Sequence, residues 1–418
     1  MVLQSFLARI VRQGTLTLID GKGRSRRLGD GGKPRCTLRL APDLREIGLM
    51  VNPPLSMAEA YMDGKITVED GSIGDLLEIT LRNHRHLEQH PMVRAARVLG
   101  RHGRPPQHYN PIGRARQNVT HHYDLSGELY DLFLDSDRQY SCAYFETSED
   151  SLEDAQLQKK RHIAAKLLLG RPGLTVLDIG SGWGGMGLYL AQIAGCRVDG
   201  LTLSAEQHAR SQARARAAGL ADRVRFHLRD YREETRTFDR IVAIGMFEHV
   251  GKPHYGEFFG KVRDLLNDDG VCLLHSIGRF DEPAPVHPFI RKYIFPGTDV
   301  PSLSEVMTAV EKSRLFTTDI EILRLHYAET LKHWHSRFLK NRDRIAALYD
   351  ERFCRMWELY LVSCEMGFRH GGLMVFQMQL SKRLETVPLT RDYMLDWERT
   401  QFSLSAQAGG REDDTRRR

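Results

Sequence analysis

The sequence predicts an α/β fold, in which a doubly wound, largely parallel sheet with helices on both faces follows a smaller N-terminal domain. Short apolar runs rich in β-branched residues alternate with helical stretches from about residue 121 to residue 402, a rhythm typical of parallel sheets. A glycine-rich turn follows the first of these runs directly, as in nucleotide-binding βα units. The first hundred residues lack this alternation, which indicates a separate unit.

The composition narrows the classes of protein to consider. The chain has 418 residues, of which 41% are hydrophobic and 27% charged, so it is neither a disordered nor a collagen-like chain. The 60 basic and 54 acidic side chains give a formal net charge of +6. This balance is too even for a dedicated nucleic-acid-binding protein, but it favours acidic partners such as phospholipid headgroups. The six cysteines include no CxxC pair, which predicts no metal site and a reducing, cytoplasmic location.

The N-terminal unit, residues 1–100, begins with a helix-like segment, MVLQSFLARIVRQG. Two strand-like pieces, TLTLID and CTLRLA, flank a charged, glycine-rich turn region, and two helical patterns follow around PPLSMAEAYMDGK and GSIGDLLEITLRNHRHL. None of these carries a catalytic motif, so we interpret the unit as an accessory domain for dimerisation or lipid contact. Residues 101–115 are rich in Pro, Gly and basic side chains and are predicted to be a linker. The polar residues 403–418 are predicted to be a disordered tail.

The predicted catalytic domain, residues 116–402, opens with the helical stretch SLEDAQLQKKRHIAAKLLL and the short buried strand TVLDIG. The strand CRVDGLTLS and the helix SAEQHARSQARARAAG follow. VRFHLRD, DRIVAIGMF and VCLLHSI are further strand candidates, since each is a compact apolar run between helical stretches. The last two, DIEILRLH and LMVFQMQLS, flank a long helical region. No apolar run reaches the ~18 residues that a membrane-spanning helix needs.

The strongest local motif is VLDIGSGWGG, residues 176–185, in which a strand ends and Gly180, Gly182 and Gly184 precede a helix. Glycines allow positive φ angles and let a ligand approach the backbone closely. The order of strand, glycine loop and helix predicts a nucleotide-type ligand. By itself the motif fits a nicotinamide-dependent enzyme as well as a methyltransferase.

The sequence of the second strand distinguishes between these two kinds of enzyme. A dinucleotide site needs an acidic residue at the tip of this strand to bind the ribose hydroxyls. Asp199 precedes Gly200, Leu201 and Thr202, so we place it inside the strand and favour a solvated strand residue. The polar groups at the strand end are instead those of TLSAEQ. This pattern argues against a nicotinamide oxidoreductase.

Several further motifs occur in a characteristic order: HHYDL, QYSCAYFE, VLDIGSGWGG, GLTLSAEQ, FDRIVAIGMFEHVG, HSIG, FIRKYIFPGT and YLVSC. Together, over residues 116–400, they closely resemble the cyclopropane-fatty-acyl-phospholipid synthase family, to which the mycolic acid cyclopropane synthases are related. The resemblance implies a Rossmann-like class I S-adenosylmethionine-dependent methyltransferase fold. It also implies transfer of a methylene group from S-adenosylmethionine to a cis double bond of a phospholipid acyl chain, with bicarbonate as the base that removes the proton.

The resemblance, together with the glycine motif, implies two sets of site residues. The cofactor set is Tyr140, Ser141, Asp178, Gly180, Gly182, Gly184, Thr202, Ser204, Gln207, Asp230 and Tyr231. The catalytic set is Cys142, Glu248, His275, Ile277 through its backbone, Tyr327 and Cys364. Asp230 and Tyr231 match the adenine-contacting position only loosely, and Ser204 also suits a helix N-cap. Cys364 has no neighbouring base, so a buried structural cysteine is an equal alternative.

The segment FIRKYIFPGT places Arg291 and Lys292 among aromatic residues, which suits a lipid phosphate above an acyl chain as well as it suits an ordinary loop. The expected partners are membrane phospholipids with unsaturated acyl chains, met by transient association with the inner face of the membrane, and no nucleic acid. The N-terminal domain makes a homodimer plausible. The alternative function is an S-adenosylmethionine-dependent methyltransferase that makes methyl-branched lipids or methylates a small molecule.

Overall fold

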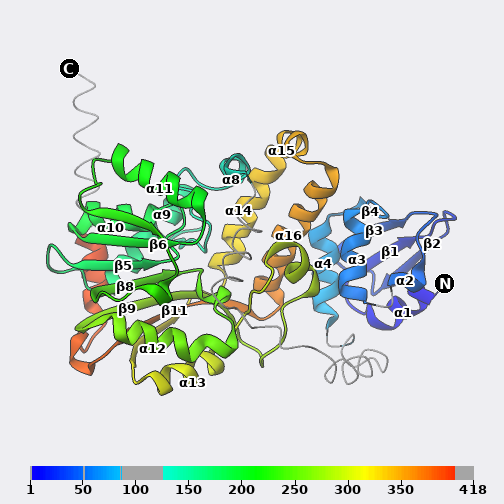
Figure 1. The fold of residues 1–418 in the computed structure, drawn as a ribbon. Helices are drawn as coiled ribbons and strands as arrows, with labels where there is room; N and C mark the ends of the chain where they lie inside the picture. The colour runs from blue at the N-terminus through cyan, green and yellow to red at the C-terminus, as the bar shows by residue number, and fades with distance from the viewer. Residues whose placement is uncertain (1, 50–51, 85, 87–125, 401–418) are drawn as a thin grey trace.

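The computed structural model describes residues 2–49, 52–84, 86 and 126–400, and these residues form two sheets with a layer of helices between them (Figure 1). The predicted linker, residues 101–115, and the predicted tail, residues 403–418, lie outside the described residues. No helix in the described part of the chain is long and apolar enough to cross a membrane.

The N-terminal unit is built on a four-stranded sheet in the order β2-β1-β3-β4. Its elements are α1 (Val2–Ile10), β1 (Thr15–Ile19), β2 (Ser25–Gly29), β3 (Arg35–Leu40), α2 (Glu46–Leu49), α3 (Pro53–Met62), β4 (Ile66–Asp70) and α4 (Ile73–Arg82). Alternation in β3 buries Cys36, Leu38 and Leu40 against the helices. The segment that we predicted to be a charged turn contains β2, which pairs with β1 and has Leu28 as its one buried residue.

The second sheet has seven strands in the order β10-β11-β9-β8-β5-β6-β7. The strands are β5 (Thr175–Ile179), β6 (Arg197–Thr202), β7 (Val224–Leu228), β8 (Phe238–Ile244), β9 (Leu266–Arg279), β10 (Phe316–Ile322) and β11 (Leu373–Ser381). Strands β5, β6, β7, β8 and β9 run parallel to one another, whereas β11 is antiparallel to β9 and to β10. The predicted α/β fold with its parallel sheet is therefore confirmed.

Helices cover both faces of this sheet because successive strand residues point to opposite sides. Val176 and Val242 pack with α9 (Leu152–Lys166), α10 (Gly185–Ala194) and α11 (Ala205–Ala217). Leu177 and Ile241, one residue along each strand, pack with α12 (Tyr255–Leu265) and α13 (Leu303–Ser313) on the other face. This two-sided burial explains the nearly continuous apolar runs seen in the sequence.

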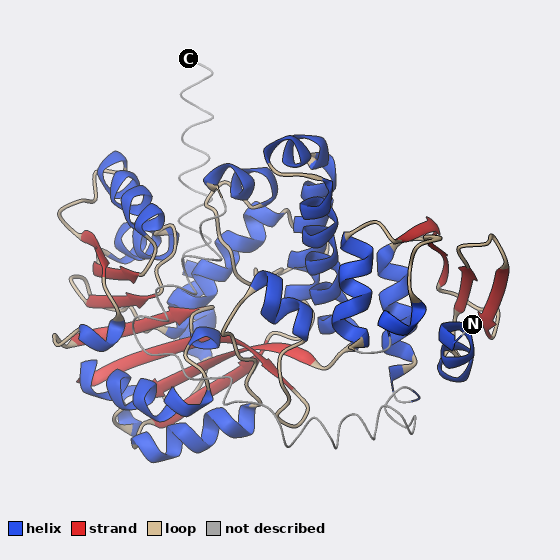
Figure 2. Cartoon of the chain, turned by 45° about the vertical axis from the view of Figure 1, so that its right-hand side comes forward, coloured by secondary structure: helices blue, strands red, loops and turns tan. Residues whose placement is uncertain are grey.

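A helical layer lies between the sheet and the N-terminal unit (Figure 2). It comprises α8 (Gly127–Phe133), α14 (His326–Lys340), α15 (Arg342–Leu348) and α16 (Glu351–His370). The region predicted as one long helical stretch is thus three helices, and Asp350 begins the last of them by accepting a hydrogen bond from the backbone of Phe353 (2.6 Å). Trp334 and Trp357 are buried in this layer, and α16 packs against both α3 and α4.

Candidate active site

A cavity opens at the carboxyl ends of β5, β6, β7 and β8, the edge where doubly wound sheets bind their ligands. The chain leaves β5 toward β6 on one side and later reaches β8 on the other, so the connections part at this point. The lining consists of residues 138–141, 178–183, 201–203, 229–232 and 244–246, with Met186, Gln207, His249, Val250 and His254.

The glycine turn after β5 shapes the floor of the cavity. Gly180, Gly182 and Gly184 all have positive φ angles, of 81°, 52° and 84°, which other residues rarely adopt. A Cβ atom on Gly182 would meet nothing within 4 Å, so its backbone is open to a ligand, whereas one on Gly184 would lie 2.6 Å from Phe226. Gly180 and Gly182 line the cavity, and Gly184 instead allows α10 to approach the sheet closely.

Asp178, the fourth residue of β5, lines the cavity with a carboxylate that is only 2% exposed. Its Oδ2 atom has no hydrogen-bond partner among the described residues. Burial raises the pKa of Asp178 to about 7, against the opposing charge of Lys159. A buried carboxylate oxygen without a partner is costly, so this position suits a ligand that brings a positive charge or an N–H donor.

The end of β6 and the first turn of α11 contribute two of the three predicted polar residues to the cavity. Thr202 and Gln207 line it, and the Thr202 hydroxyl donates to Gln207 Oε1 (2.8 Å). Ser204 is not part of the lining. Its hydroxyl accepts a hydrogen bond from the Gln207 backbone (3.3 Å) and caps α11. Ser204 therefore acts on the site through the position of Gln207.

The loop after β7 brings Asp230 and Tyr231 into the lining. The Asp230 carboxylate is buried and accepts hydrogen bonds from the Arg232 backbone (3.0 Å) and from its guanidinium (2.8 Å). The Tyr231 ring packs edge-on against Phe258, with ring centroids 5.5 Å apart. The loop is thus held by hydrogen bonds within itself and by packing against α12.

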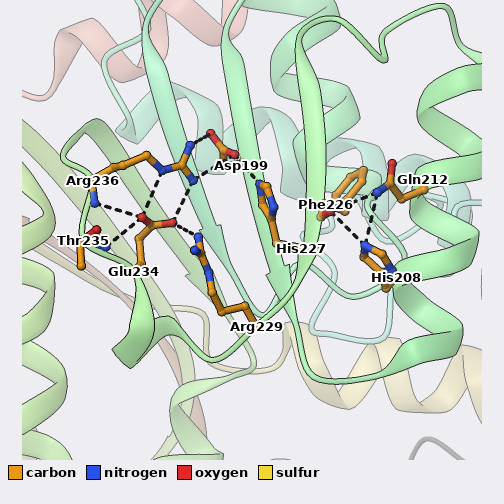
Figure 3. Close-up of polar contacts among 9 residues, drawn as sticks. All are labelled: Asp199, His208, Gln212, Phe226, His227, Arg229, Glu234, Thr235 and Arg236. Carbon is orange, nitrogen blue, oxygen red and sulfur yellow. Dashed lines mark hydrogen bonds and ion pairs between the residues drawn. The ribbon is translucent and has the colours of Figure 1, made fainter.

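A network of charged side chains supports this loop from outside (Figure 3). Glu234 is almost fully buried and accepts hydrogen bonds from its own loop backbone and from Arg229 and Arg236. Arg236 also reaches Asp199 (3.2 Å), which is bonded to His227 (2.6 Å). Asp199 lies inside β6, as we predicted, but it is one member of an ion-pair network rather than a solvated strand residue.

Segment 139–141 closes the cavity next to the glycine turn, and α9 holds it in place. Lys159 is fully buried and donates to Gln139 Oε1 (2.7 Å) and to the Ser141 hydroxyl (2.9 Å). The Tyr140 hydroxyl lies 2.8 Å from the hydroxyl of Tyr360, on α16. Lys159 and Tyr360 were not predicted as site residues, because neither forms a local motif with the residue it contacts.

Glu248 lies in a short 3-10 turn, Phe247–His249, directly after β8. Its Oε1 atom accepts a hydrogen bond from the Ile277 backbone N–H (2.7 Å), and its buried Oε2 atom has no partner among the described residues. Burial raises the pKa of Glu248 to about 7. The structure therefore pairs two of the predicted catalytic residues, with the Ile277 amide donating to Glu248.

Two further predicted residues are deeply buried. His275, on β9, is 2% exposed, and burial, followed by the charges of Lys159 and Lys166, lowers its pKa well below the usual value, so the ring is neutral. Cys142 is 1% exposed, and burial raises the pKa of its thiol. A protonated thiol is a poor nucleophile, which limits Cys142 to packing and weak hydrogen bonding.

Tyr327 and Cys364 belong to the helical layer. The Tyr327 ring packs against Trp334 and Phe368, with ring centroids 5.8 and 4.9 Å away. Cys364 lies on α16, and burial raises the pKa of its thiol to about 12. Burial raises the pKa of Tyr360 well above its usual value, and the charges of Tyr140, Tyr327 and Cys364 raise it further. The high pKa of Cys364 favours the structural interpretation of this cysteine.

The segment with Arg291 and Lys292 forms a single π-helical turn, Ile290–Ile294. The Lys292 ammonium pairs with Glu59 of α3 (2.6 Å), and the Tyr293 hydroxyl donates to the same carboxylate (2.7 Å). Hydrogen bonding to Lys292 and Tyr293 lowers the pKa of Glu59. Lys292 thus joins the segment to the N-terminal unit.

Two protein-family models match the sequence of this chain. The family model for mycolic acid cyclopropane synthetase matches residues 112–378, and a second model, for a domain of unknown function (DUF7884), matches residues 3–91. The chain belongs to the mycolic acid cyclopropane synthetase family.

Individual relatives agree with this affiliation. The chain is 33% identical to a probable fatty acid methyltransferase of Pseudomonas putida, over 87% of this chain and 92% of the relative. It is 37% identical to the cyclopropane-fatty-acyl-phospholipid synthase of Escherichia coli strain K12, over 79% of this chain and 84% of the relative. The crystal structure of mycolic acid cyclopropane synthase CmaA1 complexed with SAH and CTAB aligns with a TM-score of 0.61 and 34% identity, over 65% of this chain and 99% of that one.

The protein is therefore an S-adenosylmethionine-dependent methyltransferase that acts on lipids, as the resemblance implied. The cavity fits this cosubstrate. Its glycine turn leaves the backbone open at Gly182, and Asp178 offers an unpartnered carboxylate oxygen to a positively charged group.

Proposed function

We propose that this enzyme is a cyclopropane-fatty-acyl-phospholipid synthase, which transfers a methylene group from S-adenosylmethionine to a cis double bond of a phospholipid acyl chain. The observation that carries the proposal is Glu248, a buried carboxylate with one oxygen fixed by the Ile277 amide and the other without a protein partner. Ring closure requires a proton to leave the transferred methyl group, and a site that removes it needs such a group.

S-Adenosylmethionine supplies an electrophilic methyl group to the alkene. We assign its binding to the cofactor residues predicted from the sequence, with Asp178 facing its positively charged end and segment 139–141 closing over it. Lys159 orients this segment by holding Gln139 and Ser141. Asp230 and Tyr231 belong to the far wall, where the network around Glu234 keeps the loop in place.

Bicarbonate would supply a base of small size next to the reacting carbon. The residues proposed to hold it are Cys142, Glu248, His275, Ile277 and Tyr327. The Glu248 carboxylate, whose pKa is about 7, exchanges a proton readily near neutral pH. The neutral ring of His275 can donate one hydrogen bond to an anion. The Ile277 amide donates to Glu248 in this structure, so we assign it first to the positioning of that carboxylate.

The catalytic domain, 116–402, is proposed to take its lipid from the inner face of a membrane through transient association. Arg291 is the proposed contact for the lipid phosphate, with Lys292 nearby but paired to Glu59. The N-terminal unit is proposed as an accessory domain for lipid contact or for a homodimer.

A second function is favoured by one relative. The Pseudomonas putida protein, which aligns over most of both chains, is described as a probable fatty acid methyltransferase. A product with a methyl branch instead of a ring would follow from the same methyl transfer with loss of a different proton.

The decisive experiment uses purified protein, methyl-labelled S-adenosylmethionine and vesicles of a cis-unsaturated phospholipid. Mass spectrometry and proton NMR of the lipid distinguish the products. A gain of one CH2 with loss of the alkene signals and new upfield ring protons is the expected result. Label in the lipid without ring protons would replace the synthase by a branching methyltransferase, and unlabelled lipid would refute both.

A further inference from the structure

A chain of buried polar side chains extends from His275, on β9, to β11, α9 and β10. His275 Nδ1 lies 3.2 Å from the amide nitrogen Nε2 of Gln377, on the neighbouring strand β11. Gln377 Oε1 in turn accepts a hydrogen bond from Lys166 Nζ (2.6 Å), at the end of α9. Lys166 also forms an ion pair with Glu321 of β10, which is hydrogen-bonded to His162 (2.6 Å).

The inner members of this chain are shielded from water. His275, Gln377 and Lys166 are 2%, 1% and 2% exposed. A buried hydrogen bond that is broken or reversed leaves an unsatisfied polar group, which costs more than the bond itself contributes. Each of the three side chains is therefore confined to the orientation that satisfies its neighbours.

The chemistry of Lys166 sets the direction of these bonds. An ammonium group can only donate. Burial lowers the pKa of Lys166, but the charge and hydrogen bond of Glu321 oppose this shift, and the ion pair keeps Lys166 in the charged form. The oxygen of the Gln377 amide must therefore face Lys166, and its NH2 group must face His275. His275 Nδ1 must then accept, so in a neutral ring it carries no proton, and the proton resides on Nε2.

We propose that Lys166, acting through Gln377, fixes His275 in the tautomer that has its proton on Nε2. Lys166 and Gln377 are positioning residues, because neither has been placed in the site itself. The consequence for catalysis rests on the proposed function: the free ring nitrogen of His275 is a permanent hydrogen-bond donor, suited to an anion such as bicarbonate and unable to accept a proton itself.

The test is 15N NMR of protein labelled in its histidine rings, without any added ligand. The spectrum separates protonated from unprotonated ring nitrogens, and a His275→Asn variant assigns the signals. The wild-type protein should show an unprotonated Nδ1 and a protonated Nε2 for His275. A proton on Nδ1 in the wild-type protein would overturn the proposal.

The variant Gln377→Glu replaces the donor by a carboxylate, which can only accept, so His275 Nδ1 should gain a proton. Gln379→Glu is the matched control. Gln379 lies two residues along β11 and donates to the Lys166 backbone (2.6 Å) and to Tyr393 (2.8 Å) rather than to the ring, so its variant should leave the tautomer unchanged. An unprotonated Nδ1 in folded Gln377→Glu would also overturn the proposal.

Lys166→Met provides a second, independent variant if Gln377→Glu fails to fold. Without the ammonium, the amide of Gln377 can turn over, and both tautomers of His275 should become populated. A single, unchanged tautomer in Lys166→Met would show that Lys166 does not act as proposed. A separate titration of the wild-type protein with bicarbonate addresses the proposed function: an Nε2 signal that does not move counts against the anion site and leaves the tautomer assignment standing.

Discussion

Replacing Glu248 by Gln should slow the reaction and, at alkaline pH, stabilise the fold. Glu248→Gln keeps an oxygen that can accept the hydrogen bond of the Ile277 amide, but it removes the ionisable group. If Glu248 assists proton removal, turnover should fall by about 100-fold or more, the usual contribution of a positioned acid or base. Binding of S-adenosylmethionine, measured by calorimetry, should be unchanged.

The effect on stability follows from the pKa of Glu248. Burial raises it from the ordinary 4.5 to about 7 in the folded protein, so folding favours the protonated form. Below pH 4.5 the carboxyl is protonated in both the folded and the unfolded chain, and ionisation costs the fold nothing. The cost grows as the pH rises and is complete above about pH 7, where it reaches roughly 3 kcal/mol. The amide escapes this cost.

Urea unfolding of the cofactor-free protein at pH 5 and pH 8.5 measures the difference. The free energy of unfolding of Glu248→Gln, relative to wild type, should be larger at pH 8.5 than at pH 5 by about 2.5 kcal/mol, since the unfolded carboxyl is already mostly ionised at pH 5. Glu234→Gln is the matched control with the opposite sign. Burial alone would raise the pKa of Glu234, but hydrogen bonds and charge from Arg236 outweigh it and lower this pKa to about 2, so its ionised form stabilises the fold at both pH values.

Two results would refute this reasoning. Equal relative stability of Glu248→Gln at the two pH values would mean that the folded protein does not hold a carboxyl with a raised pKa. Unchanged turnover would remove Glu248 from the proposed chemistry, whatever its pKa.

Three further variants test other parts of the site. Asp178→Asn should weaken binding of S-adenosylmethionine by about 10-fold or more, since it removes the charge that would face the cosubstrate; calorimetry giving wild-type affinity would contradict this placement. Cys364→Ser should retain turnover within about 2-fold, because a thiol with a pKa of about 12 is no nucleophile at neutral pH; a loss of activity in a folded variant would restore its catalytic role. Asp199→Asn should lower the free energy of unfolding in urea by about 1 kcal/mol, because Arg236 then loses one of its two carboxylates. It should also weaken cosubstrate binding several-fold. Unaltered affinity would show that the ion-pair network does not support the loop that binds the cosubstrate.

The sequence predicts the central sheet well because its signals are local. The strand of TVLDIG and its glycines lie next to one another in the chain, and glycine adopts the positive φ angles found at Gly180 and Gly182 without steric cost. Strand β2 was missed because its sequence, SRRLG, has only one buried side chain, Leu28. Pairing with β1 makes this segment a strand, and such pairing leaves no periodic pattern in so short a run.

The site is predictable only where its residues share a motif. Gly184 and Ser204 belong to the predicted motifs, yet one serves close packing and the other caps a helix. Contacts between distant segments are harder to foresee. Tyr360 meets Tyr140 across 220 positions of sequence, and Lys166 reaches Gln377 across 211. No pattern in either segment indicates its partner, because the contact is created by the packing of helices onto the sheet.

The double contact of Glu59 with Lys292 and Tyr293 bears on how this chain can be shortened. The synthase CmaA1 aligns over nearly its whole length with only 65% of this chain, which suggests the catalytic part as a minimal enzyme. In this protein, however, removing the N-terminal residues would strip α3 and α4 from α16 and leave Lys292 and Tyr293 without their acceptor. A truncated enzyme would need polar substitutions on the face of α16 that α3 and α4 now cover, in order to remain soluble. The N-terminal unit and the catalytic part should therefore be kept together in protein engineering.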